Sequence, residues 1–162
     1  MPDTRDTNKA LARKILSAWN QRGETHMPEE LAHPQMVRYF APPVGMASAL
    51  GQPPVAPALP VTAIQGQNYQ EDLIIADAEY TFTAWHMTGQ HLGTLYGRPA
   101  TGLPVTVYGA DVIRVVDGQV IQHWDWYSKS RVQALGQLGL LDADMQSYLI
   151  NNGLLGRNRK LP

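Results

Sequence analysis

The first residues of the chain carry its clearest hydrophobic pattern. Leu11, Ile15 and Trp19 recur every four residues behind a polar start, which is the spacing of one face of an α-helix. The pattern predicts an amphipathic helix that ends near Gly23. A short second helix is predicted to begin at Pro28, because proline and the two glutamates after it favour a first helical turn.

Beyond residue 70 the pattern changes to short β-type runs separated by Gly, Pro and Asp. These runs predict strands at 73–75, 79–88, 105–115 and 119–127, after a brief earlier strand at 36–40. Asp117-Gly118 between the last two runs is a strong hairpin signal, since both turn positions favour positive φ. Helices follow after Ser130 and over 142–151. The order predicts one α+β domain over 1–162, with 156–162 as a tail.

The predicted hairpin brings acidic residues together. Alternation along the last strand places His123 and Asp125 on one face. Counting outward from the turn pairs Val116 with Gln119, and Asp111 with Asp125 or its neighbour. A carboxyl group on the inner face of a sheet loses hydration, which raises its pKa, and a second carboxylate raises one of the two further. Such a group is a better base near neutral pH.

A purely structural role for these carboxylates is the alternative. An aspartate on a strand is often exposed or paired with an arginine, and Arg114 or Arg131 could serve here. Perturbed acids alone suggest a functional site without proving one. The sequence therefore leaves catalytic and structural roles open for Asp111, His123 and Asp125.

Composition narrows the class of partner. The chain has 13 Lys and Arg against 14 Asp and Glu, a net charge of −1, so we expect no nucleic-acid partner. No apolar run approaches the roughly 20 residues of a membrane helix, so we expect no membrane partner. The absence of cysteine excludes disulfides and thiolate chemistry. The polar N-terminus lacks a secretory signal, which predicts a cytoplasmic protein.

The segment 39–70 contains no Asp, Glu, Lys or Arg, yet it holds six of the chain's twelve prolines. Apolar side chains such as Leu50 and Leu59 lie among these prolines, although a surface loop has no need to be so apolar. We expect this segment to form a lid over a pocket mouth or an interface with a partner subunit. An ordinary linker is an equally open alternative.

The histidines of the sheet region give little support for a metal centre. His86, His91 and His123 could ligate a metal together with a carboxylate. None of the His spacings typical of metal sites occurs in the sequence. We therefore expect no metal ion.

Three segments of the sheet region stand out as motifs: GQHLGTLYGRPATG at 89–102, GADVIR at 109–114 and DGQVIQHW at 117–124. As a set they resemble the SnoaL-like polyketide cyclase (ester cyclase) family of the NTF2-like superfamily. The later Gln137-Leu138-Gly139 resembles the C-terminal signature of that family. The resemblance runs from about Glu71 to Gly139.

The resemblance implies an α+β, NTF2-like cone, in which a curved antiparallel β-sheet wraps around N-terminal helices and encloses an apolar pocket. It also implies a homodimer or homotetramer and a mechanism without a cofactor. In the cyclases an aspartate on the last strand removes a proton next to a carbonyl, and the enolate closes a ring by an intramolecular aldol reaction. Asp125 matches that aspartate, His123 matches a neighbouring polar residue, and Asp111 stands where some cyclases have a histidine.

These features together predict an enzyme that acts on a bulky, hydrophobic, carbonyl-containing small molecule. Asp125 is the expected general base, with His123 and Asp111 as polarising or proton-returning partners. Five further side chains are expected to line the substrate pocket: Trp85, His86, His91, Tyr108 and Trp126. Cyclisation, isomerisation and hydroxylation all remain open, because one fold hosts many reactions.

Two hypotheses compete with an enzyme. A non-catalytic protein could bind a hydrophobic metabolite, but a carrier of an apolar ligand has little reason to bury two unpaired carboxylates. The chain could also act as a subunit of an assembly, with an exposed sheet face around Val112 and Trp124 as the interface. The subunit hypothesis is compatible with both an enzyme and a binding protein.

Overall fold

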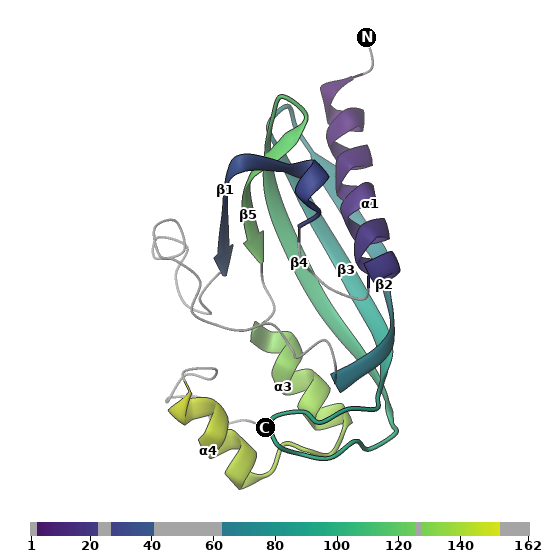
Figure 1. Ribbon diagram of the computed structural model, residues 1–162, viewed down its shortest axis with the longest axis vertical. Coiled ribbons are helices and arrows are strands. Elements are labelled where there is room, and N and C mark those ends of the chain that lie inside the picture. Colours follow the sequence, from purple (N-terminus) through teal and green to yellow (C-terminus); the bar gives the residue numbers. More distant parts are fainter. Residues whose placement is uncertain (1–2, 23–26, 41–62, 126–127, 153–162) are drawn as a thin grey trace.

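A five-stranded sheet forms the body of the protein. The computed structural model describes residues 3–22, 27–40, 63–125 and 128–152. The elements are α1 (Thr4–Arg22), η1 (Glu29–Leu31), β1 (Ala32–Phe40), β2 (Ile64–Ala76), β3 (Tyr80–His91), β4 (Pro104–Val116), β5 (Gln119–Asp125), α3 (Ser128–Gln137) and α4 (Ala143–Asn151). The strand order is β1-β5-β4-β3-β2. Neighbouring strands are antiparallel except β1 and β5, which run parallel. The predicted α+β class with its curved sheet is confirmed (Figure 1).

The β4–β5 hairpin forms as the sequence predicts. Asp117 and Gly118 occupy its turn with φ of 50° and 76°. Val116 pairs with Gln119, and a register shift after Arg114 brings Asp111 opposite Asp125. An extra residue in one strand of a pair produces such a shift. The hairpin therefore places both carboxyl groups side by side, as predicted.

Both ends of the uncharged segment 39–70 belong to strands of the sheet. Its last part, from Ile64 to Gln70, forms the first half of β2 and pairs with β3. Polar, uncharged side chains fill most of this stretch, so it lacks the alternation of apolar residues that marks a strand. Residues 39 and 40 belong to β1. The remaining part, 41–62, lies outside the described residues, and so do Gly153 and the predicted tail.

Helix α1 covers one face of the sheet, called here the inner face (Figure 1). Its predicted apolar stripe is buried against this face. Trp19 meets the rings of Tyr69 and Trp85 edge-on, with ring centroids 5.4 and 6.0 Å apart. The inner-face residues of β3, β4 and β5 are therefore buried beneath a helix.

Two asparagines fasten α1 to the sheet through backbone groups. The side-chain amide of Asn8 donates to the carbonyls of Asp77 and Ala78 at 3.0 and 3.2 Å. Asn20 donates to the carbonyl of Tyr69 at 2.9 Å and accepts from its N–H at 2.5 Å. Because β2 is an edge strand, the amide of Asn20 satisfies backbone groups that a further strand would otherwise pair.

Helices α3 and α4 lie at the end of the sheet far from the β4–β5 turn (Figure 1). Asp142 caps α4 by accepting from the N–H of Met145 at 2.8 Å, and Arg98 donates to the same carboxylate at 2.7 and 2.9 Å. Gln137 exchanges two hydrogen bonds with the backbone of Thr106. Over the described ranges, none of the helices combines the length and the hydropathy of a membrane-spanning segment.

On the opposite face of the sheet, called here the outer face, Trp124 is less exposed than the sequence predicts. Trp124 is only 7% exposed, because its ring stacks on Tyr39 with centroids 5.3 Å apart and lies near Tyr80. The prediction of an exposed Trp124 is therefore wrong. The homodimer or homotetramer remains a prediction.

Replacing Asn8 by alanine should destabilise the fold. The side chain is buried and holds two turn carbonyls, so the Asn8→Ala variant should lose about 1–3 kcal/mol of unfolding free energy. Gln21→Ala on the exposed side of α1 is the matched control and should change stability by less than about 0.5 kcal/mol. Urea unfolding of the two variants measures the difference. Equal stabilities would show that Asn8 does not fasten α1.

Candidate active site

Four polar side chains from three strands meet on the inner face of the sheet. Asp111 comes from β4, His123 and Asp125 from β5, and Arg38 from β1. Arg38 is the strand partner of His123, and Asp111 is the partner of Asp125. The side chains of Asp125, His123 and Asp111 are 0%, 1% and 8% exposed, whereas that of Arg38 is 18% exposed. We call these four residues the acid cluster.

The imidazole of His123 lies between the two carboxyl groups. Its Nε2 is 2.9 Å from Asp111 Oδ1 and 3.2 Å from Asp125 Oδ1. The outer oxygen of each carboxyl group has a donor of its own. Arg38 Nε donates to Asp125 Oδ2 at 2.5 Å, and the indole N–H of Trp85 donates to Asp111 Oδ2. One carboxyl group is thus paired with a permanent cation and the other with a neutral donor.

This asymmetry separates the acidities of the two carboxyl groups. Burial raises the pKa of Asp111 to about 7, and the negative charge of Asp125 adds to the rise, although His123 opposes it. Burial alone would also raise the pKa of Asp125, but the charges of His123 and Arg38 outweigh it and leave that pKa below its usual value. Asp125 is therefore ionised near neutral pH, while Asp111 holds or shares a proton.

Gly109 allows Trp85 to reach Asp111. The two residues are direct partners in the β3–β4 pair. A Cβ atom at Gly109 would lie 2.3 Å from the six-membered ring of Trp85, far inside van der Waals contact. The indole lies across β4 at this point, and its N–H meets the carboxyl group two residues further along. Glycine at 109 is therefore a steric requirement of the hydrogen bond to Asp111.

The space between α1 and the acid cluster is nearly filled. The cavity there measures about 10 Å³ and is bounded by α1 side chains, Asp111 and His123. This is about the room that one water molecule needs. A bulky molecule cannot approach Asp111 or His123 from this side without displacing α1. Arg38 is the most exposed member of the acid cluster.

The structure brings together only some of the predicted substrate-binding residues. Trp85 is buried on the inner face beside Asp111. His86 and Tyr108 lie on the outer face, because neighbouring residues of a strand point to opposite sides. Tyr108 is 52% exposed there, and His86 binds Asp72 through Nδ1 at 2.7 Å. His86 and Tyr108 therefore do not share a site with the carboxyl groups.

His91 and Trp126 complete the predicted set. His91 is buried at the end of β3, where its Nδ1 accepts from the backbone N–H of Thr101 at 3.2 Å. This contact closes the connection between β3 and β4, so the placement indicates a structural role. Trp126 lies outside the described residues.

Arg38 is the member of the acid cluster that sequence reasoning misses. Arg114, one expected partner for a strand aspartate, points to the outer face and binds Glu79 at 3.3 Å. The side chain of Arg131 lies outside the described part of the chain. Only the parallel pairing of β1 with β5 places Arg38 beside Asp125. No local pattern around Arg38 predicts that pairing. The sequence marks Arg38 only as the last charged residue before the uncharged segment.

The acid cluster also contains a possible set of metal ligands. One ligand-type atom each from Asp111, His123 and Asp125 lies within 4.8 Å of the others. A cation there would compete with Arg38 and Trp85, which already donate to the two carboxyl groups. Arg38 supplies the compensating positive charge, so the geometry fits a proton between the carboxyl groups better than a metal ion.

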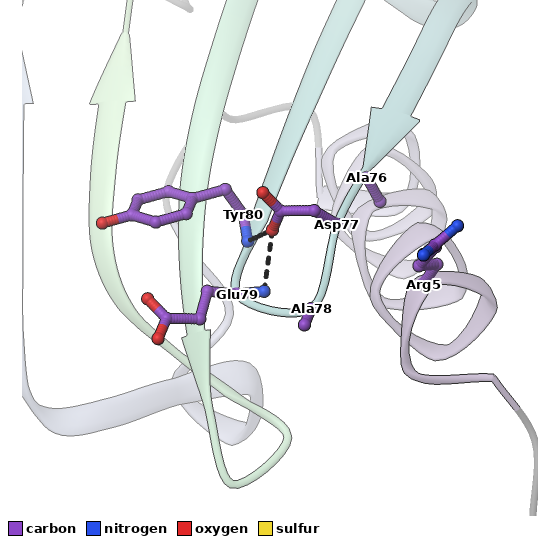
Figure 2. Close-up of a pocket in the computed structure, with 6 residues that line it drawn as sticks. All are labelled: Arg5, Ala76, Asp77, Ala78, Glu79 and Tyr80. Carbon is purple, nitrogen blue, oxygen red and sulfur yellow. Dashed lines mark hydrogen bonds between the residues drawn. The ribbon is translucent and has the colours of Figure 1, made fainter.

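A larger hollow lies elsewhere, at the turn between β2 and β3. It measures about 590 Å³ and is open to the surface. Asp77 Oδ1 accepts from the backbone N–H groups of Glu79 and Tyr80 at 2.8 and 2.7 Å, which closes the turn. Arg5 of α1 forms the opposite rim (Figure 2). No member of the acid cluster lines this hollow, so it is not part of the site.

Comparison with known proteins agrees with the resemblance seen in the sequence. The family model for SnoaL-like polyketide cyclase matches residues 9–135. Aklanonic acid methyl ester cyclase DnrD from Streptomyces peucetius is 30% identical over 122 residues, which cover 72% of this chain and 81% of that protein.

Solved structures share the fold. AclR, a candidate hydroxylase from Streptomyces galilaeus, is 25% identical with a TM-score of 0.64, over 83% of this chain and 96% of its own. IdmH, a candidate polyketide cyclase from Streptomyces antibioticus, is 24% identical with a TM-score of 0.63, over 81% and 97%. The IdmH likeness shows the fold alone.

The raised pKa of Asp111 makes stability depend on pH. The unfolded chain releases this proton near pH 3.8, whereas the folded chain keeps it to about pH 7. The wild type should therefore lose stability through this group as the pH rises from about 4 to 7, by up to about 1.4 kcal/mol per pH unit. Asp111→Asn cannot ionise and should not show this loss. Denaturant unfolding across this range measures the difference between the two proteins, and a constant difference would contradict the raised pKa.

An alanine at 109 should disturb the indole of Trp85. The clash should lower the unfolding free energy of Gly109→Ala by about 1–3 kcal/mol. Gly136→Ala is the control, because nothing lies within 4 Å of a Cβ at this position in α3, and alanine favours a helix. Thermal unfolding and near-UV circular dichroism measure both variants. The steric argument fails if Gly109→Ala is as stable as Gly136→Ala.

Proposed function

The chain belongs to the SnoaL-like polyketide cyclase family, and from that premise we propose that it closes a ring in a bulky, carbonyl-containing substrate by general-base catalysis without a cofactor. Asp125 is the proposed base. The observation that carries the proposal is geometric: the two buried carboxyl groups share His123, but Arg38 donates to Asp125 whereas the neutral indole of Trp85 donates to Asp111. Paired groups whose environments push their pKa values apart are typical acid and base partners.

The proposed reaction needs only proton transfers and one new carbon–carbon bond. The carboxylate of Asp125 takes a proton from the carbon next to a carbonyl, and the electrons of the broken C–H bond form an enolate. The enolate carbon attacks a second carbonyl of the same molecule. The new alkoxide takes a proton, for which Asp111 and His123 are the proposed source. The proton taken up by Asp125 then passes to the group that gave its proton to the alkoxide, with His123 Nε2 lying between the two carboxyl groups. This restores the acid cluster to its first state, so the overall reaction is an isomerisation.

The lowered pKa of Asp125 restricts the substrate. An ionised aspartate paired with Arg38 and His123 is a weak base, so it can remove only an already acidic proton. A carbon flanked by two electron-withdrawing groups has such a proton. We therefore propose a substrate with an activated carbon acid instead of a simple ketone. The substrate named for DnrD, aklanonic acid methyl ester, is the first compound to test.

Hydroxylation is the second candidate function, since AclR, a candidate hydroxylase, has the same fold at 25% identity. Binding of a hydrophobic metabolite without catalysis is less well supported. Burying two carboxyl groups costs free energy that a carrier of an apolar ligand does not need to spend. The acid cluster therefore favours an enzyme.

Replacing Asp125 by asparagine should abolish most of the activity. Without the base, kcat/KM for ring closure should fall by about 10²–10⁴-fold. Aklanonic acid methyl ester is the test substrate, and the product has the same mass but a different chromatographic retention time. Asp72→Asn is the control, because Asp72 is an exposed carboxylate on the outer face that binds His86. It should keep wild-type activity.

The two variants give a clear decision. Loss of activity in Asp125→Asn alone supports the assignment of the base. Turnover within a few fold of the wild type, with a folded protein and unchanged KM, would show that Asp125 is not the base. A product that gains an oxygen atom would favour hydroxylation over ring closure.

A further inference from the structure

The two oxygens of Asp111 have different partners. The indole N–H of Trp85 donates to Oδ2. Because an indole nitrogen only donates, this oxygen has to accept. The other oxygen, Oδ1, lies 2.9 Å from His123 Nε2. When Asp111 is protonated, its hydrogen therefore belongs on Oδ1, the oxygen that faces His123.

Asp125 has a buried oxygen that a proton on this side of Asp111 would satisfy. Arg38 Nε donates to Asp125 Oδ2. Oδ1 receives no hydrogen bond from the described residues, although His123 Nε2 lies 3.2 Å away. The two carboxyl groups are within hydrogen-bonding reach of each other. A buried acceptor without a donor costs free energy, and a proton held between the two carboxyl groups removes that cost.

The indole of Trp85 is held in place by its neighbours. Trp85 is 1% exposed. The rings of Trp19 and Tyr69 meet it edge-on, with centroids 6.0 and 5.3 Å away. It also lies over Gly109, where a Cβ atom would clash with it. A donor fixed in this way needs no rearrangement when a proton moves nearby.

The groups around Asp111 come from several elements. Among the described residues, His123 and Asp125 face it from β5, with Arg38 of β1 beyond Asp125, and the phenol of Tyr69 acts on it from β2. Burial raises the pKa of Tyr69, so the phenol stays neutral. The α1 side chains that border the space beside Asp111 carry no charge; they are Ala12, Ile15, Leu16 and Trp19.

We propose that Trp85 is a positioning residue of this site: its indole N–H occupies Asp111 Oδ2 and thereby keeps the proton of Asp111 on Oδ1, between His123 and Asp125. The inference rests on the proposed function, which it deepens. In that reaction the O–H bond of Asp111 breaks as an O–H bond forms on the alkoxide. The proton that Asp125 has taken up then refills the same oxygen of Asp111. Trp85 itself gives up no proton.

The indole N–H reports this role in the unmodified protein. Its proton resonance should move downfield as Asp111 ionises, because a carboxylate accepts more strongly than a carboxylic acid. The midpoint should be that of the Asp111 step near pH 7. Trp124 is the internal control, since it is buried on the outer face and no described residue accepts from its indole N–H. A Trp85 resonance that does not follow Asp111 would overturn the inference.

Trp85→Phe removes the N–H but keeps an aromatic ring in the core. In a ¹³C titration of the carboxyl carbons, the Asp111 step should move to higher pH by about half a unit or more, because the carboxylate loses a donor. With aklanonic acid methyl ester, kcat should fall by about 10–100-fold and KM should change only a few fold. Trp124→Phe is the matched control and should keep both the Asp111 step and kcat of the wild type.

A role for Trp85 in packing alone predicts a different result. Trp85→Phe would then be less stable, yet its Asp111 step would match that of Trp124→Phe, and this result overturns the inference. If Trp85→Phe does not fold, replacing Trp85 by 3-benzothienylalanine decides, because sulfur takes the place of the N–H in a ring system of nearly the same size. An unshifted Asp111 step in that protein counts equally against the inference.

The titrations need no substrate, so they separate the inference from the function on which it rests. If the wild type does not convert the ester, but the Trp85 resonance and the Asp111 step behave as expected, the proposed function fails and the placement of the proton is supported. If the ester is converted and folded Trp85→Phe keeps kcat within a few fold of the wild type, Trp85 does not position a reacting proton and the inference is overturned.

Discussion

The site depends on the burial of two carboxyl groups against one imidazole. Burial alone would protonate both, and a neutral pair has no base. Arg38 prevents this on one side by donating to Asp125, while Asp111 receives only the neutral indole N–H of Trp85. The pKa of Asp111 is therefore raised and that of Asp125 is lowered, although the two aspartates face each other across one hairpin. Gly109 supports this arrangement because it leaves room for the indole ring of Trp85.

Much of this arrangement could be predicted from the sequence, because it is local along the chain. Asp117-Gly118 fixes the turn, and counting from it pairs Asp111 with Asp125. Alternation then places His123 on the same face. The stripe of Leu11, Ile15 and Trp19 predicts the helix that covers them. These inferences use spacings of a few residues, for which backbone geometry gives a nearly unique answer.

The rest could not be predicted because it depends on contacts between distant segments. Arg38 reaches Asp125 only through the parallel pairing of β1 with β5. The wrong prediction that His86 and Tyr108 line the substrate pocket has a different cause. Strand alternation alone already places these two residues on the face opposite to Trp85 and Asp111. The first half of β2 carries polar, uncharged side chains at the edge of the sheet, so its composition does not predict a strand. The close fit of α1 over Asp111 and His123 follows from side-chain packing, which the periodicity of the sequence does not predict.

The most direct test of this account is a pH titration of the aspartate carboxyl carbons by ¹³C NMR, with the Asp111→Asn and Asp125→Asn variants used for assignment. Two coupled carboxyl groups titrate as a pair, so the result is two apparent pKa values. The account predicts one step near pH 7 that is dominated by Asp111 and one below the usual range of aspartate that is dominated by Asp125. Two steps near the ordinary aspartate value of about 4, or a higher value for Asp125 than for Asp111, would contradict it.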